Sequence, residues 1–119
     1  MFVSVVIPTY NRRPILEKCL SALEDQQLAG ALQDYEVVVV DDGSTDGTPS
    51  WLSEQSQRFP HVRLIEQEHG GPAEGRNRGV DHARGDVIVF IDSDLVVTET
   101  FLATHARALK QCWQRRGDR

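Results

Sequence analysis

Short apolar runs alternate along this chain with longer segments in which apolar residues recur at helical spacing. The apolar runs predict four strands, at residues 3–7, 36–40, 62–66 and 86–91. The intervening and following segments predict four helices, at residues 13–27, 48–58, 70–83 and 98–115. In the first helix, the apolar residues share one face: Ile15, Leu16, Cys19, Leu20 and Leu23. Asn11 is placed to cap the start of this helix. The chain is therefore expected to alternate strictly between strands and helices.

This alternation predicts one α/β domain over residues 1–119. Strands that are apolar throughout are typical of a parallel sheet covered by helices on both faces. Right-handed crossovers then give the strand order 3-2-1-4, half of a doubly wound, Rossmann-like sheet. Ligands bind such sheets at the carboxyl ends of the strands, beside the point where the strand order reverses. We therefore expect a functional site where residues 8–11, Asp41-Asp42 and Asp92-Ser93-Asp94 converge.

Composition narrows the possible functions. The net charge of −5 argues against nucleic acid as the main partner. The two cysteines are too far apart in sequence for a disulfide framework or a zinc site, and the helical phase of Cys19 predicts a buried free thiol. No apolar stretch approaches the roughly 18 residues of a membrane span, and the first residues lack the pattern of a signal peptide. We expect a cytoplasmic protein, with any membrane attachment outside these residues.

The acidic triplet Asp92-Ser93-Asp94 follows the apolar run of residues 87–91. Two carboxylates at the end of a buried strand repel one another unless a cation lies between them. Mg²⁺ and Mn²⁺ favour such hard oxygen ligands and can carry a phosphate. The alternative is a capping cluster for the last helix, but Leu95-Val96-Val97 separate the triplet from the expected helix start at Thr98. A metal and phosphate role is therefore favoured.

Two further motifs are less specific. Asp41-Asp42-Gly43-Ser44 is either a turn after a strand or a carboxylate acceptor for a nucleobase or ribose, and the residues alone leave both open. The glycine-rich segment of residues 70–79 matches neither a P-loop nor a dinucleotide fingerprint. Arg76 is its candidate anion ligand, because it lies in the first turns of a helix. The histidines lack mutual ligand spacing and are interpreted as surface or loop residues: His61, His69, His82 and His105.

Four motifs together carry a resemblance to a known family. In chain order they are Val3-Ser4-Val5-Val6-Ile7-Pro8-Thr9-Tyr10-Asn11, the segment of residues 39–48, Gly70-Gly71-Pro72-Ala73 with Arg76-Asn77, and Phe90-Ile91-Asp92-Ser93-Asp94. This set resembles the family 2 glycosyltransferases and spans most of the chain. The resemblance implies a partial GT-A fold, a nucleotide-sugar donor such as a UDP- or dTDP-sugar, and Mn²⁺ or Mg²⁺. It also implies transfer to an acceptor hydroxyl with inversion at the anomeric carbon.

The resemblance also implies roles for single residues. Those that would bind the donor nucleotide are Pro8, Thr9, Tyr10, Asp41, Asp42, Arg76, Asp92 and Ser93. Among them, Asp42 would bind the base with Asp41 in support, and Asp92 would lie at the ribose. Asp94 would bind the metal. Members of the family continue into an acceptor site with a carboxylate general base, so residues 1–119 would be the donor-binding half, inactive alone, with the base beyond Arg119 and the acceptor unknown.

Two rival classes remain open at this point. A phosphoryl-accepting receiver domain has a similar length and alternation, but it needs a lysine at a later strand end, whereas Lys110 falls within a helical pattern. A non-catalytic nucleotide-binding module is the second alternative.

The fourth strand carries a further expectation. In the order 3-2-1-4 it lies at an edge of the sheet, and its run of residues 87–91 is apolar on both faces. Such an edge pairs readily with another chain, so the sequence predicts self-association through strand four.

Overall fold

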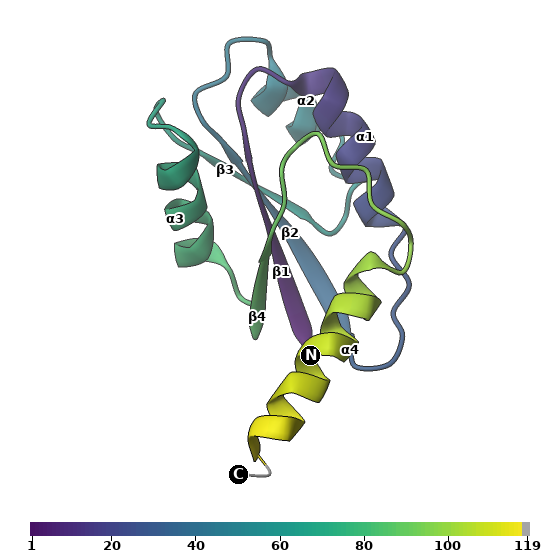
Figure 1. The fold of residues 1–119 in the computed structure, drawn as a ribbon. Coiled ribbons are helices and arrows are strands. Elements are labelled where there is room, and N and C mark those ends of the chain that lie inside the picture. Colours follow the sequence, from purple (N-terminus) through teal and green to yellow (C-terminus); the bar gives the residue numbers. More distant parts are fainter. Residues whose placement is uncertain (118–119) are drawn as a thin grey trace.

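A computed structural model describes the backbone of residues 1–117 and the side chains of residues 1–112. Strands and helices alternate as predicted (Figure 1). In chain order the elements are β1 (Phe2–Thr9), α1 (Arg13–Glu24), β2 (Asp34–Asp41), α2 (Thr48–Glu54), β3 (Val62–Glu66), α3 (Pro72–His82), β4 (Val87–Phe90) and α4 (Phe101–Gly117). All strand pairs are parallel and the sheet order is β3-β2-β1-β4. The predicted Rossmann-like sheet and its order, those of a partial GT-A fold, are confirmed.

Alternating residues of the two central strands form two apolar layers. On one face, β1 and β2 pack against α1, α2 and α4 through a core that includes Val5, Val37, Leu20, Trp51 and Leu102. The other face is smaller and lies under α3, on the opposite side of the sheet in Figure 1. Here the buried positions of α3 are Gly75 and Gly79. A Cβ at Gly79 would lie 2.3 Å from Val6 Cγ1, so the glycine is what lets α3 approach the sheet closely.

The first helix ends earlier than its periodicity predicts, at Glu24 rather than residue 27. Tertiary hydrogen bonds explain the difference. The Gln26 side chain donates to the Thr98 carbonyl at 2.7 Å and accepts from Leu102 N at 3.0 Å, and Gln27 N donates to the Glu99 carbonyl at 2.8 Å. These bonds hold the segment before α4 against the end of α1.

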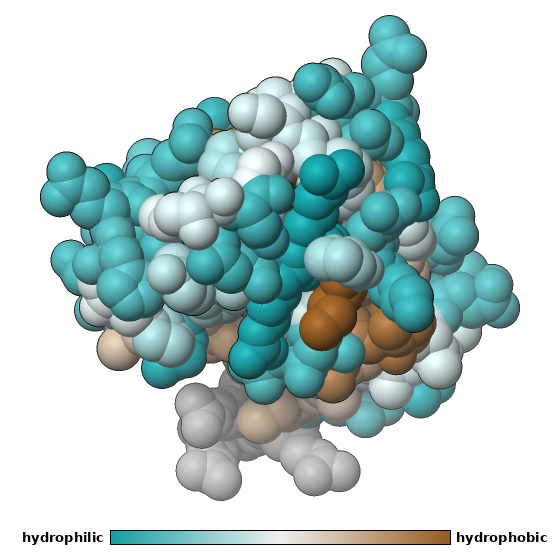
Figure 2. Space-filling model, turned by 90° about the horizontal axis from the view of Figure 1, so that it is seen from above, coloured by the Kyte–Doolittle hydropathy of each residue, from teal (hydrophilic) through white to brown (hydrophobic). Residues whose placement is uncertain are grey.

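Strand β4 is an edge strand, as predicted, and pairs with β1 only among the described residues. The expectation of a buried strand is wrong, because no described element covers its outer edge. Val87, Ile88 and Val89 are only partly buried, and Phe90 is 48 % exposed. Leu95 and Val96 in the next loop are also exposed. Viewed onto the carboxyl ends of the strands, a hydrophobic patch interrupts a largely hydrophilic surface (Figure 2).

No helix within the described range has both the length and the apolar character that crossing a bilayer requires.

Candidate functional site

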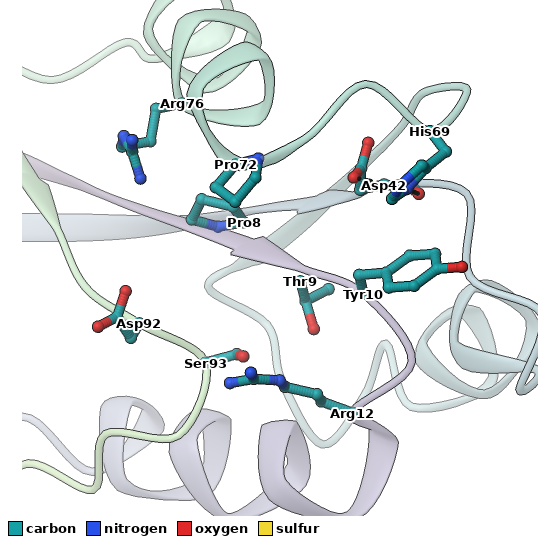
Figure 3. A pocket seen from close by; sticks show the side chains of 10 residues that line it. All are labelled: Pro8, Thr9, Tyr10, Arg12, Asp42, His69, Pro72, Arg76, Asp92 and Ser93. Atoms are coloured by element: carbon teal, nitrogen blue, oxygen red, sulfur yellow. Dashed lines mark hydrogen bonds and ion pairs between the residues drawn. The ribbon is translucent and has the colours of Figure 1, made fainter.

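A cavity of about 320 Å³ opens at the carboxyl end of the sheet, where the topology predicts a ligand site. The ends of β1 and β2, the start of α3 and the loop after β4 all contribute to it (Figure 3). Its lining residues are Pro8, Thr9, Tyr10, Arg12, Asp42, His69, Pro72, Arg76, Asp92 and Ser93. The structure therefore brings together seven of the eight residues expected to bind the nucleotide. Asp41 lies beneath the lining, and Asp94 lies outside it.

The loop after β1 is fixed to the loop after β2 by Asn11. Its backbone N donates to Ser44 Oγ at 2.9 Å, and its side-chain Oδ1 accepts from Thr45 N at 2.8 Å. Asn11 adopts a left-handed backbone with φ of 50°, which this residue type tolerates. The expectation that Asn11 caps α1 is wrong, because Arg12 occupies the cap position and the Asn11 side chain joins the two loops instead.

The Asp41 carboxylate shapes the turn below the cavity. It is buried, and its Oδ2 accepts a hydrogen bond from Ser44 N at 2.9 Å. Its Oδ1 has no hydrogen-bond partner among the described residues. Asp41 thus supports the cavity floor rather than facing a ligand.

The Asp42 carboxylate faces the cavity but is already surrounded by nitrogen atoms of this chain. Gln67 Nε2 and Gly70 N lie 2.8 and 2.7 Å from Oδ1, whereas Gly71 N and His69 Nδ1 lie 3.0 and 2.9 Å from Oδ2. A carboxylate accepts about four hydrogen bonds, so its capacity is filled. Burial raises the pKa of Asp42, but these donors and His69 together hold it below its ordinary value of 3.8. Asp42 therefore fastens the loop between β3 and α3.

His69 is an exposed loop residue, as interpreted from the sequence, and it also lines the cavity, which the sequence did not predict. Its side chain is exposed, yet its ring packs on Tyr10 with centroids 4.5 Å apart. Its Nδ1 lies beside Asp42, 27 positions earlier in the chain. Motif spacing could not reveal this contact. The available signal was the strand order, because residues that follow the neighbouring strands β2 and β3 must meet at one edge of the sheet.

The other end of the cavity carries charge. Arg76 from α3, Asp92 and Ser93 lie here, and Arg12 extends toward Ser93 (Figure 3). Arg12 was not predicted as a site residue. Asp92 and Asp94 are exposed, and neither side chain makes a hydrogen bond or ion pair within the described part of the chain.

The predicted free thiol Cys19 lies under the acidic triplet. Its Sγ donates to the Asp92 carbonyl at 3.9 Å, and it is fully buried as expected. Burial, followed by the negative charge of Asp94, raises the pKa of the Cys19 thiol to about 12. The segment of residues 92–94 therefore rests on α1, with Cys19 as an inert packing residue.

The described residues could supply part of the coordination shell of a divalent cation, but not all of it. Within residues 1–112, no three side chains of the ligating types gather closely enough to hold a metal by themselves. Mg²⁺ is commonly bound through one or two carboxylates, with substrate phosphates and water completing its shell. Asp92 and Asp94, with oxygens free of protein partners, match that pattern and not an all-protein cage.

The cavity does not fit a phosphoryl-accepting receiver. No lysine lines it among the described residues, and Lys110 lies by a separate cavity with Met1 and Asp86.

Comparisons with known proteins agree with the cavity and the fold. The chain is 38 % identical over 108 residues to the uncharacterized glycosyltransferase YfnE of Bacillus subtilis, covering 91 % of this chain and 27 % of that protein. The structure of S. aureus TarS 1-349 in complex with UDP-GlcNAc superposes with a TM-score of 0.79 at 31 % identity, over 93 % of this chain and 32 % of that one. The mannosyltransferase PcManGT from Pyrobaculum calidifontis, in complex with GDP-Man and Mn²⁺, gives a TM-score of 0.68 at 38 % identity, covering 77 % and 27 %.

This chain thus spans between 14 % and 33 % of the length of curated relatives that resemble it. The sequence profile of glycosyl transferase family 2 matches residues 4–113, nearly the whole chain. Together with the parallel sheet and the four motifs, this match shows that the chain belongs to glycosyl transferase family 2.

Proposed function

We propose that residues 1–119 are the donor-binding part of a glycosyltransferase and bind a nucleotide sugar in the cavity at the carboxyl end of the sheet. The observation that carries this proposal is the division of the cavity into an aromatic end, with Tyr10 and His69, and a charged end, with Arg12, Arg76 and Asp92. A nucleoside diphosphate has the same division between a flat base and a charged diphosphate. The similar structures solved in complex with UDP-GlcNAc and with GDP-Man support this assignment.

The nucleoside would lie at the aromatic end. Tyr10 is 42 % exposed and offers a ring for base stacking, with Pro8 and Thr9 forming the adjoining wall. Asp42 would contribute by holding His69 and Gly70-Gly71 in place. A direct hydrogen bond from Asp42 to the base would require one of its four present neighbours to move away.

The diphosphate would lie at the charged end, near Arg76, Asp92 and Ser93. Asp94, with Asp92, would hold Mg²⁺ or Mn²⁺ together with phosphate oxygens. When bound there, the cation would stabilise the negative charge that develops on the departing diphosphate. Attack by an acceptor hydroxyl with inversion also requires a base, and we assign that role to no residue of this chain. We therefore expect residues 1–119 alone to bind donor without transferring its sugar.

Isothermal titration calorimetry with UDP, in Mg²⁺ and again in EDTA, tests this proposal. We expect saturable binding that EDTA weakens, and weaker binding by Tyr10→Ala, which removes the stacking surface. Leu28→Ala is the matched control, because Leu28 is an exposed apolar residue outside the cavity and its loss should leave binding unchanged. Absence of UDP binding by the unchanged protein, or equal losses in the two variants, would contradict the proposal.

A further inference from the structure

We propose that Arg12 is a second phosphate-binding cation, and that Arg12 and Arg76 bind the diphosphate of the donor from opposite sides of the cavity. This inference rests on the proposed function, because it assumes that a nucleoside diphosphate occupies the cavity. It adds a residue that no motif singled out, and it assigns part of the charge neutralisation to the protein itself.

The two guanidinium groups come from different elements. Arg12 immediately precedes α1, and its side chain runs along the cavity toward Ser93, whereas Arg76 projects from α3 (Figure 3). Pro8 lies between them in this view, and both arginines line the cavity. An anion placed between the two side chains could therefore contact both.

Neither arginine has an ion-pair partner among the described side chains. In contrast, Arg58 pairs with Glu17 at 3.0 Å and Arg63 pairs with Glu36 at 2.8 Å. Among the described residues, Asp42 is the only carboxylate besides Asp92 that lines the cavity, and its oxygens are already engaged. The charged end thus presents two uncompensated cations and one free carboxylate, and this balance favours an anionic ligand.

A neutral hydroxyl group completes the proposed site. Thr9 is only 4 % exposed, and its Oγ1 has no hydrogen-bond partner within the described residues. Figure 3 shows this hydroxyl on the side of the cavity where Arg12 lies. A buried hydroxyl without a partner is costly, and a phosphate oxygen would satisfy it. The planar guanidinium fork suits the oxygens of a phosphate better than a single-point cation would.

The adjacent residue Arg13 supplies a matched control. Its guanidinium carbon lies 5.4 Å from the centroid of the Trp51 ring, and it does not line the cavity. Arg12→Gln and Arg13→Gln therefore remove the same charge one position apart, inside and outside the proposed site. Arg12→Lys keeps the charge but loses the planar fork.

The test is a set of NMR-detected titrations with uridine, UMP, UDP and inorganic pyrophosphate, each in Mg²⁺ and in EDTA. For Arg12→Gln we expect UDP affinity to fall about ten- to a hundredfold in both conditions, pyrophosphate affinity to fall in parallel, and uridine affinity to stay unchanged. Arg12→Lys should lose less than Arg12→Gln, and Arg13→Gln should match the unchanged protein.

Three results would overturn the inference while leaving the proposed function intact. The first is UDP affinity in Arg12→Gln equal to that of the unchanged protein. The second is an equal loss in Arg13→Gln, which would indicate a general effect of net charge. The third is loss of uridine binding along with UDP binding in Arg12→Gln, because the variant would then have damaged the whole cavity. Failure of the unchanged protein to bind any nucleotide would instead overturn the proposed function, and this inference with it.

Discussion

Two acidic clusters that look alike in sequence have opposite states in the structure. Asp41 and Asp42 at the end of β2 are buried, and Asp42 is surrounded by four nitrogen atoms of its own chain. Asp92 and Asp94 after β4 are exposed and have no side-chain partner in the described residues. Both clusters follow apolar strands that end at the same edge of the sheet.

The difference shows how the same residue type can serve two purposes around one cavity. At β2 the carboxylates are used to hold loops, so the aromatic end of the cavity is formed before a ligand arrives. At β4 the carboxylates keep their oxygens available, as a cation shared with a phosphate would require. The β2 cluster is therefore structural, whereas the β4 cluster is the one proposed to bind a ligand, and the following predictions test that division.

The largest effect is expected from removing the Asp42 carboxylate. Asp42→Ala leaves three part-buried hydrogen-bond donors, Gln67 Nε2, Gly70 N and Gly71 N, without their acceptor, so the free energy of unfolding should fall by about 1–3 kcal/mol in urea denaturation. The matched variant Asp92→Ala should change it by less than about 0.5 kcal/mol, because that carboxylate has no described partner. Similar losses in the two variants would remove the distinction between the clusters.

Acid should destabilise the protein through the engaged carboxylates. Besides Asp42, the pKa of Glu36 is lowered: burial raises it, but hydrogen bonds from Ser4, Arg84 and Arg63 outweigh that effect. The ordinary pKa is 3.8 for Asp42 and 4.5 for Glu36, and folding lowers both. Each carboxylate therefore contributes its full stabilisation of the folded state above its ordinary pKa. This stabilisation is lost as the pH falls through the lower pKa of the folded state. We expect the urea midpoint to decline below about pH 4, and less steeply in Asp42→Asn. A midpoint that stays constant down to pH 3 would contradict this account.

Changes in the β4 cluster should affect binding and not folding. Asp94→Asn keeps the shape but deletes an anionic ligand, so UDP affinity measured by calorimetry should lose its dependence on Mg²⁺. Asp92→Asn should weaken Mg²⁺-dependent binding about tenfold. Both variants should keep the unfolding midpoint of the unchanged protein. Undiminished Mg²⁺ dependence in Asp94→Asn would exclude it as a metal ligand.

The smallest effect concerns the open edge beside the β4 cluster. Phe90 is half exposed on an unpaired edge, so we expect weak, concentration-dependent self-association in sedimentation velocity, reduced a few-fold by Phe90→Lys. Leu28→Lys is the control, since Leu28 is 55 % exposed but lies between α1 and β2, away from the edge strand β4. A single monomeric species at all concentrations would show that this edge does not pair.

The sequence predicted the fold well because its signals are local. Strand and helix periods, together with the handedness of crossovers, were sufficient for the order β3-β2-β1-β4. The prediction from sequence failed where a tertiary contact determines the local structure. The Gln26 side chain ends α1 early by bonding to residues near α4, and the edge position of β4 leaves Phe90 exposed despite its apolar surroundings in sequence.

The site was predicted in outline for the same reason. Motifs at strand ends placed Tyr10, Asp42, Arg76 and Asp92 around one cavity. They could not show that Asp42 is already saturated, because its partners lie after another strand. Nor could the motifs show that Arg12, and not Arg13, lines the cavity. The two adjacent arginines differ only in the direction that the start of α1 gives each side chain.

The most direct test of the central claim is a map of amide chemical-shift changes when UDP and Mg²⁺ are added to the labelled protein. We predict the largest changes at the lining residues of the cavity, with Thr9, Tyr10, His69, Arg76 and Ser93 foremost, and little change near the separate cavity by Met1 and Gln33. No shift on saturation with UDP, or changes centred on Met1 and Gln33, would contradict the account.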